Sequence, residues 1–386
     1  MGRPEKIQYT TLAQRYVARY RILTSVGIHI NFWIAANLLL CAITFLHLKI
    51  LGQVFGTPVD IRPKLFLLTG LLFGFLYGLC LGLVNYYFDK KIFRQQPLGK
   101  LLLVKTFGSL IILVLILALV RYVLFDRFIS GSLNVRANAL TEESWDTVFY
   151  ILLIYYFFMT LVISFINQVN KKYGPGVLLP LLLGKYRKPQ EEERIFMFMD
   201  LKSSTATAER LGHFKYSSFI RDCFSDINEV LLPFRAQVYQ YVGDEIVVTW
   251  EESEGLRNLF CIKFYFACEE QFRSRAEYYL TNYGLLPEFK AGVHTGKVTA
   301  VEIGEIKRDI AYHGDTLNTA ARIQSICNEY NRKLLASAYL ASKILWDEGL
   351  KTEDLGLVHL RGKTEKIGVV SIDKSVLSLA ATTKTG

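Results

Sequence analysis

The stretch Val238-Tyr-Gln-Tyr-Val-Gly-Asp-Glu-Ile-Val-Val-Thr-Trp250 has the pattern of two short β segments that fold back at Gly243-Asp244. Val, Ile, Tyr and Trp favour strands, and a Gly supplies the backbone conformation that a tight turn needs. The carboxylate of Asp244 then lies at the tip of the hairpin, where it meets solvent or a ligand instead of the core. Taken alone, this stretch predicts a hairpin and no particular chemistry.

Two further stretches carry polar groups that suit work on a nucleotide. The apolar run Arg194-Ile-Phe-Met-Phe-Met-Asp200 also ends on an Asp, and two strand-end carboxylates are what a pair of Mg²⁺ ions requires. The stretch Gly314-Asp-Thr-Leu-Asn-Thr-Ala-Ala-Arg322 places Asn318 and Arg322 four residues apart, on one face of a helix.

In this order and spacing, the three stretches resemble the catalytic domain of the class III nucleotidyl cyclases, the adenylate and guanylate cyclases. The resemblance covers about Glu193 to Asp373 and implies an α+β, ferredoxin-like fold with a βααβ core. It implies a reaction in which the ribose 3′-hydroxyl attacks the α-phosphate of a nucleoside triphosphate and expels pyrophosphate. Two Mg²⁺ or Mn²⁺ ions in each active site would neutralise the phosphates and activate the hydroxyl.

The resemblance also assigns roles to individual residues. Asp200 and Asp244 match the metal carboxylates, and the backbone carbonyl of Leu201 is an additional candidate ligand. Asn318 matches the residue that orients the ribose, and Arg322 the one that stabilises charge on the α-phosphate, for which a forked guanidinium is suited. In the family these last two come from the partner protomer, which implies an obligate homodimer with two shared sites.

Further residues are expected around the phosphates. Lys202-Ser-Ser-Thr205 leads from a strand into a helix, and the free N–H groups at a helix start favour phosphate oxygens. Ser203, Ser204 and Thr205 are therefore phosphate-binding candidates, although Ser and Thr also serve there as ordinary helix caps. Lys363, near the end of the domain, resembles a phosphate-binding Lys of the family.

The base pocket departs from the family pattern. Gln240 stands where adenylate cyclases usually carry Lys and guanylate cyclases Glu, and Ala311 stands where Asp, Thr or Ser is usual. A Gln amide can pair with the N6 and N7 edge of adenine, and Asp309, two residues from Ala311 on a strand, would face the same side. These residues favour ATP as the substrate and leave GTP as the alternative.

Composition predicts a membrane protein. Hydrophobic residues make up 51% of the 386 residues and the mean hydropathy is +0.25, with the apolar excess concentrated before Lys171. Four apolar runs are long enough to cross ~30 Å of hydrocarbon, which predicts an all-α anchor of four transmembrane helices in a lipid bilayer. The four runs are Val26 to Leu46, Leu65 to Phe88, Leu101 to Leu124 and Thr147 to Val169.

Charge sets the expected orientation. The net charge is +10, but the Lys and Arg residues cluster beside the apolar runs, which indicates membrane topology and no nucleic acid partner. The N-terminal lead, the loop around residues 90–100 and the segment 171–188 are basic, whereas the loop from Asp126 to Asp146 is mixed. A multi-pass inner-membrane protein with both termini and the catalytic domain in the cytoplasm follows from this asymmetry.

The expected organisation is a basic segment at 1–25, a membrane domain at 26–170, a linker at 171–192, the cyclase domain at 193–374 and a tail at 375–386. Within the cyclase domain we expect a mostly antiparallel sheet with helices on one face. We also expect one long helix from Leu256 to Tyr283 and a strand from Glu288 that ends at Gly296. Two alternatives remain: a guanylate cyclase, and a catalytically inactive cyclase-like membrane receptor or dimerisation module. An unknown ligand at the membrane domain is compatible with each of these interpretations.

Overall fold

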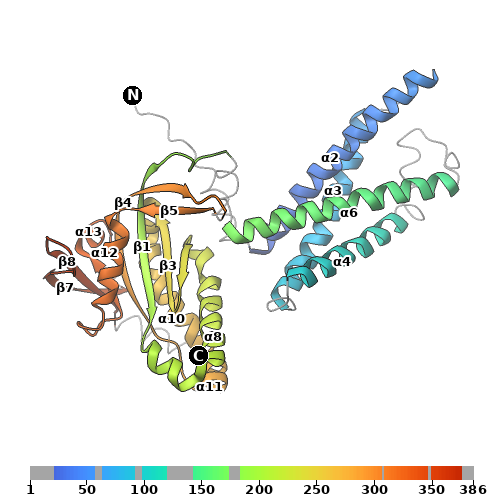
Figure 1. Cartoon of the computed structure of the whole chain (residues 1–386). Helices are drawn as coiled ribbons and strands as arrows, with labels where there is room; N and C mark the ends of the chain where they lie inside the picture. The colour runs from blue at the N-terminus through green and yellow to red at the C-terminus, as the bar shows by residue number, and fades with distance from the viewer. Residues whose placement is uncertain are drawn as a thin grey trace, which may run out of the picture. The chain divides into compact units, whose positions relative to one another are not determined.

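The computed structural model describes residues 21–56, 63–91, 98–119, 142–173, 183–306, 308–346 and 349–375. The chain divides into two units, one that contains Arg19–Pro175 and one that contains Gly176–Gly386 (Figure 1). The basic lead up to residue 20, the loop at 120–141, the linker at 174–182 and the tail after 375 lie outside the described residues.

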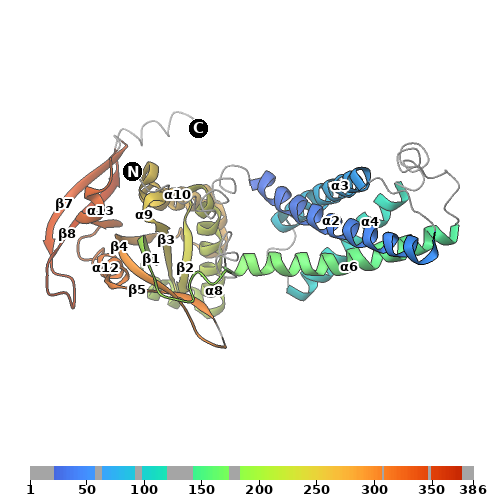
Figure 2. The ribbon, with the colours of Figure 1, turned by 90° about the horizontal axis from the view of Figure 1, so that it is seen from above.

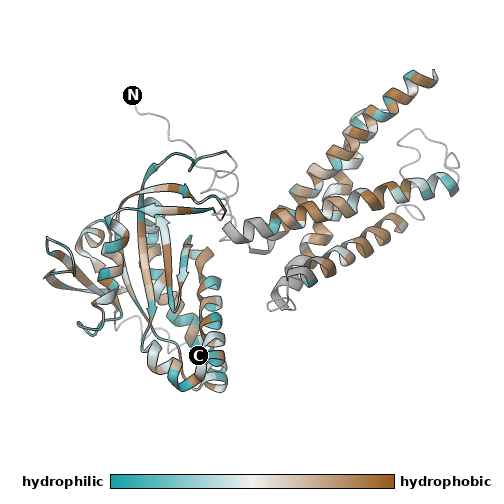
Figure 3. Cartoon of the chain, in the orientation of Figure 1, coloured by the Kyte–Doolittle hydropathy of each residue, from teal (hydrophilic) through white to brown (hydrophobic). Residues whose placement is uncertain are grey.

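The first unit consists of apolar helices, as Figure 3 shows by colour. Three of them contain stretches long and apolar enough to cross a membrane, namely Val26–Phe55, Leu67–Val84 and Glu143–Asn167. The remaining helix has a shorter apolar stretch, Thr106–Leu119, and the end of the third predicted span, 120–124, lies outside the described residues. The helices are α2 (Arg21–Phe55), α3 (Pro63–Lys91), α4 (Leu98–Leu119) and α6 (Glu142–Tyr173).

Helix α3 packs on α2 through a row of glycines spaced four residues apart. A Cβ added at Gly74 would lie 2.7 Å from Ile34 Cα and 2.8 Å from Trp33 O, and one at Gly78 would lie 2.7 Å from Ile30 Cα. Small residues at this spacing let two helix backbones approach closely. The row continues at Gly70 and Gly82.

Replacing Gly74 by Ala should therefore destabilise the membrane unit. The added methyl group meets backbone atoms, which cannot rotate away, so we expect a loss of about 1–3 kcal/mol from overpacking. Gly108→Ala on α4 is the matched control, because a Cβ there has nothing within 4 Å. Thermal unfolding of the purified chain in detergent measures both variants, and equal midpoints for the two would contradict the close contact.

An aromatic cluster joins α6 to α2 and α3. The ring centroids of Trp33 and Tyr77 are 4.4 Å apart, and those of Trp33 and Tyr156 are 5.1 Å apart. The Tyr156 hydroxyl donates a hydrogen bond of 2.7 Å to Asn37 Oδ1. Such an internal hydrogen bond stabilises polar groups in an apolar helix bundle, because the apolar surroundings offer them no other partner.

The second unit is built on one mixed sheet of eight strands (Figures 1 and 2). The strand order is β2-β3-β1-β4-β6-β8-β7, with β5 paired to β4, so that the β7–β8 hairpin lies at the opposite end from β2. Only the pair of β4 and β6 is parallel among the described strands, which confirms the mostly antiparallel α+β sheet. The strands are β1 (Gln190–Leu201), β2 (Gln237–Val242), β3 (Glu245–Glu251), β4 (Phe289–Ile303), β5 (Asp309–His313), β6 (Leu334–Ser337), β7 (Leu350–Val358) and β8 (Ile367–Lys374).

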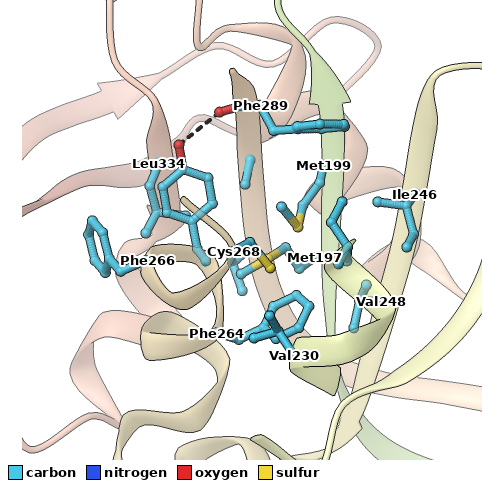
Figure 4. Close-up of a cluster of buried hydrophobic side chains, with 14 of the residues drawn as sticks. Met197, Met199, Val230, Ile246, Val248, Phe264, Phe266, Cys268, Phe289 and Leu334 are labelled. Carbon is cyan, nitrogen blue, oxygen red and sulfur yellow. Dashed lines mark hydrogen bonds between the residues drawn. The ribbon is translucent and has the colours of Figure 1, made fainter. Parts of the chain in front are cut away.

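Helices cover both faces of this sheet, so the expectation of a single covered face is wrong. Met197 and Met199 of β1 pack in the main core with residues of α8 (Ser204–Leu231) and α10 (Phe260–Ser274) (Figure 4). The alternate residue Phe196 packs on the other face, in a cluster with Ala320 of α12 (Asp315–Ser325). A Cβ at Gly292 would lie 2.6 Å from Ala320 O, so this glycine of β4 makes room for α12.

The long helix predicted from Leu256 to Tyr283 is interrupted, so that prediction is also wrong. The structure has a short 3₁₀ turn at Arg257–Leu259, then α10, then α11 (Ala276–Tyr283), with a break at Arg275. Arg275 forms an ion pair with the fully buried Asp226 of α8. The hydroxyl of Tyr279 donates to the same carboxylate at 2.5 Å, so the break orients α11 to satisfy a buried charge.

Strand β4 runs on to Ile303, seven residues beyond the predicted stop at Gly296. Gly296 is a strand residue with ordinary backbone geometry, and a Cβ there would lie 2.6 Å from Thr316 Oγ1 at the start of α12. The glycine therefore permits a close helix approach and makes no turn, which explains why its sequence signal was misleading.

Candidate active site

Two carboxylates meet at the ends of β1 and β2. Asp200 is the last residue but one of β1, and Asp244 lies in the turn between β2 and β3, both half-buried. Strand β1 pairs with β3 so that Asp200 lies opposite Glu245, the residue next to Asp244. The two predicted metal carboxylates are thus brought together at one edge of the sheet.

The charges in this corner repel one another. Burial, and then the charge of Asp244, raise the pKa of Asp200 above its ordinary value. Burial, followed by the charges of Asp200 and Asp244, raises the pKa of Glu245 to about 7. Carboxylates crowded in this way are stabilised in their ionised form by a nearby cation.

This donor set fits a hard divalent cation. Carboxylate oxygens are the ligands that Mg²⁺ and Mn²⁺ prefer, and Mg²⁺ is commonly held by one or two carboxylates together with substrate phosphates. The described residues contain no group of three or more His, Cys, Asp or Glu side chains placed to hold a metal ion. Phosphates and water would therefore complete the coordination shell around Asp200 and Asp244.

Two further residues act on Asp200, and neither was predicted from the sequence. Lys290 of β4 lies directly opposite Asp200 in the sheet, is 7% exposed, and its charge favours the ionised carboxylate. Its Nζ donates a hydrogen bond of 2.8 Å to Asn328 Oδ1. Gln324, buried on α12, acts on the Asp200 carboxyl and lowers its pKa. Lys290 had one visible signal, a charge inside an otherwise apolar strand.

Helix α12 presents the two predicted catalytic side chains on its outer surface. Asn318 is exposed and Arg322 is half-buried, one turn further along. Among the described residues the Arg322 guanidinium has no hydrogen bond or ion pair, which leaves its donors available. A Cβ at Gly362 would lie 3.3 Å from one guanidinium nitrogen, so the loop that carries Lys363 packs against Arg322.

The remaining predicted residues fall into separate places. Ser203 caps α8 in a left-handed conformation (φ 57°) without a side-chain capping bond, while the side chain of Ser204 lies near that of Tyr216 on the same helix. Leu201 buries its side chain in the main core, and Thr205 is exposed in the first turn of α8.

The base-pocket candidates lie on two strands. Gln240 is exposed on β2 and pairs with Val247, after an irregularity in the β2–β3 ladder. Ala311 is buried on β5, and Asp309 is exposed at the end of that strand, where its Oδ1 accepts the N–H of Ile310 at 2.9 Å. Tyr239 and Tyr312, which neighbour Gln240 and Ala311 in sequence, are in ring contact with centroids 5.2 Å apart.

Comparison with known families identifies the same part of the chain. Residues 187–372 match the model of the adenylate and guanylate cyclase catalytic domain. The matched range includes every predicted site residue, and its ends lie close to the start of β1 and the end of β8.

Two curated relatives from Rhizobium meliloti (strain 1021) share this region. "Adenylate cyclase 2" is 36% identical over 216 residues, which are 56% of this chain and 60% of the relative. "Adenylate cyclase 1" is 23% identical over 205 residues, 52% of this chain and 30% of the relative. The chain therefore spans less than two thirds of the length of either relative.

Solved structures of similar proteins cover about half of the chain. The adenylyl cyclase CyaB from P. aeruginosa has a TM-score of 0.43 and 16% identity, over 49% of this chain and 97% of that one. The guanylate cyclase domain of RhGC from Catenaria anguillulae, in complex with GTP, has a TM-score of 0.40 and 17% identity, over 48% of this chain and 98% of that one.

Proposed function

We propose that this chain is a membrane-anchored adenylate cyclase, because residues 187–372 match the family model of the adenylate and guanylate cyclase catalytic domain. It converts ATP to 3′,5′-cyclic AMP and pyrophosphate at the cytoplasmic face of the membrane. The observation that carries the proposal is the pairing of Asp200 and Asp244 at one sheet edge, where burial and mutual repulsion raise the pKa of Asp200. The relative at 36% identity, which is named an adenylate cyclase, supports the choice of reaction.

The proposed chemistry divides among the residues as follows. Asp200, Asp244 and the carbonyl of Leu201 hold two Mg²⁺ or Mn²⁺ ions, which supply charge for the phosphates and for the attacking 3′-oxygen. Asn318 orients the ribose, and Arg322 donates to the α-phosphate as negative charge accumulates there. The N–H groups around Ser203, Ser204 and Thr205, together with Lys363, bind the remaining phosphate oxygens.

The geometry of α12 supports a site shared between two protomers. Successive residues of a helix turn by about 100°, so Arg322 lies about 200° around the helix from Gln324. Gln324 faces Asp200 of its own chain, and Arg322 therefore points away from that carboxylate. In a homodimer, Asn318 and Arg322 would reach the metal site of the partner, while Gln324 stays beside Asp200 of its own chain.

The apolar helices of the first unit supply the anchor in this proposal. The basic charges beside them support a topology with both termini and the catalytic unit on the cytoplasmic side of the inner membrane, by the positive-inside rule. A ligand bound by the membrane helices would be the input signal of such a protein.

Turnover by the purified full chain tests the proposed function. The assay compares ATP with GTP, each with Mg²⁺ and with Mn²⁺, and detects cyclic nucleotide and pyrophosphate. Cyclic AMP as the main product supports the proposal, and cyclic GMP would make the chain a guanylate cyclase. Absence of both products under all four conditions would favour the inactive cyclase-like module.

Base choice has its own test, the substitution Gln240→Glu. Glutamate only accepts hydrogen bonds, so it can take the N1 and N2 protons of guanine and offers adenine N7 no donor. If the amide contacts the base in two places, we expect the ratio of kcat/KM for ATP to kcat/KM for GTP to fall. The expected decrease corresponds to roughly 1–3 kcal/mol.

Two controls accompany that measurement. Asp309→Ala removes the other polar candidate, which is already hydrogen-bonded to its own strand, and should leave the ATP-to-GTP ratio within about twofold. If the ATP-to-GTP ratio stays constant in Gln240→Glu but collapses in Asp309→Ala, the base is recognised by β5 and not by β2.

A further inference from the structure

Lys363, the proposed phosphate-binding lysine, is paired with a carboxylate of its own chain. Lys363 Nζ forms an ion pair with Asp315 Oδ2, in the first turn of α12. The Thr319 hydroxyl donates to the same oxygen at 3.2 Å. The lysine side chain is 18% exposed, whereas the Asp315 side chain is 65% exposed and faces solvent. The ion pair therefore lies at the surface that carries Asn318 and Arg322.

Asp315 is the negative group in an otherwise positive cluster. The Arg322 guanidinium lies against Gly362, next to Lys363, and its charge acts on Asp315. His294 of β4 faces Lys363 and Asp315; burial and then the charge of Lys363 lower its pKa to about 4, so it is neutral at pH 7. Its Nδ1 lies 2.7 Å from Ser337 Oγ. Without Asp315, the charges of Lys363 and Arg322 would face solvent uncompensated.

We propose that Asp315 is an internal competitor of the substrate phosphates for Lys363, which sets the affinity of the site for the polyphosphate chain. This inference rests on the proposed function, in which Lys363 binds a phosphate. In the free protein Asp315 holds Lys363, and the incoming phosphate displaces the carboxylate. When pyrophosphate leaves, Asp315 pairs with Lys363 again and so favours product release.

The relative strength of the two interactions makes this exchange feasible. An ion pair whose carboxylate is exposed to solvent is screened and contributes little, whereas a polyphosphate carries several charges and accepts several charge-assisted hydrogen bonds at once. The displaced Asp315 remains close to the bound phosphate, and like charges at short distance weaken binding. A carboxylate at this position should therefore lower the affinity for phosphate, not raise it.

Binding of inorganic tripolyphosphate to the full chain in detergent, with EDTA present, tests the proposal without any catalytic step. Asp315→Asn removes the charge and nearly preserves the shape, and we expect the Kd for tripolyphosphate to fall about three- to tenfold. Asp315→Glu keeps a carboxylate and should stay near the parent value. Glu365→Gln is the matched control, because it makes the same change of net charge at an exposed side chain in the loop that carries Lys363.

Two outcomes would overturn the proposal. A Kd that rises or stays unchanged in Asp315→Asn would mean that Asp315 positions Lys363 for the phosphate or has no influence on it. An equal decrease of the Kd in Glu365→Gln would mean that only the net charge of the protein determines the affinity for tripolyphosphate. Thermal unfolding of each variant verifies that the fold is retained.

A double-substitution cycle shows whether the effect passes through Lys363. In the Lys363→Ala background the additional change Asp315→Asn should no longer tighten binding as much as in the parent. If Asp315→Asn lowered the Kd as much in the Lys363→Ala background as in the parent, competition for the lysine would be contradicted. In turnover measurements, Asp315→Asn should lower the KM for ATP without raising kcat, a division that a merely structural role would not produce.

Failure of this inference is distinguishable from failure of the proposed function. If the chain makes no cyclic nucleotide but Asp315→Asn still tightens tripolyphosphate binding, only the enzymatic proposal falls. If it makes cyclic AMP and tripolyphosphate binding does not respond, only the role of Asp315 falls.

Discussion

Asp244→Asn should abolish turnover while the protein remains folded. The substitution removes one of the two charges that meet at the sheet edge, and the side chain lies in a turn and contributes nothing to the described core. We expect kcat to fall more than about a hundredfold, which corresponds to at least ~2.7 kcal/mol on the barrier. The measurement is the rate of cyclic AMP formation at saturating ATP and metal ion.

Asp354→Asn is the control for this variant. Asp354 lies at an irregular point of the β7–β8 hairpin, where its Oδ1 accepts the N–H of Gly356, and it is remote from Asp200 in the strand order. Its activity should match that of the parent. Activity of Asp244→Asn within about tenfold of the parent, or ~1.4 kcal/mol, would exclude Asp244 from the metal site.

Mixing two inactive variants should restore activity if each site is shared. Asp200→Ala removes a metal carboxylate and Arg322→Ala removes the group that comes from the partner, so each homodimer is inactive. In a heterodimer one of the two sites keeps every group. With random association about half of the dimers are heterodimers, and each has one intact site, so about a quarter of the parent activity should return.

The matched control is a mixture of Asp200→Ala with Asp244→Ala. Both substitutions affect the same half of the site, so no heterodimer contains an intact site and no activity should return. Heterodimers of Asp200→Ala and Arg322→Ala that form in good yield but stay inactive would place a complete site within one protomer.

Local sequence patterns were sufficient for the parts of the site that depend on chain neighbours. Asp200 and Asp244 each follow a run of strand-forming residues, so their positions at strand ends could be predicted from the pattern alone. Asn318 and Arg322 share a helix face because of their spacing.

Features that depend on strand register and on distant packing could not be predicted in this way. Lys290 contacts Asp200 because β4 pairs with β1 in one register, across 90 residues of chain. Gln324 reaches Asp200 only because α12 covers the face of the sheet that we expected to be bare. Gly296 has the composition of a turn, yet its role is to admit Thr316, which is known only once α12 is placed.

The two-sided contact of α12 gives the proposed dimer a mechanical property. Gln324 on one side acts on the Asp200 of its own chain, and in the proposed dimer Arg322 on the other side reaches the metal site of the partner. A packed helix moves as a rigid element, so a displacement at one side is transmitted to the other. Filling one catalytic centre would then alter the geometry of its twin, and the dependence of rate on ATP concentration would depart from a simple hyperbola.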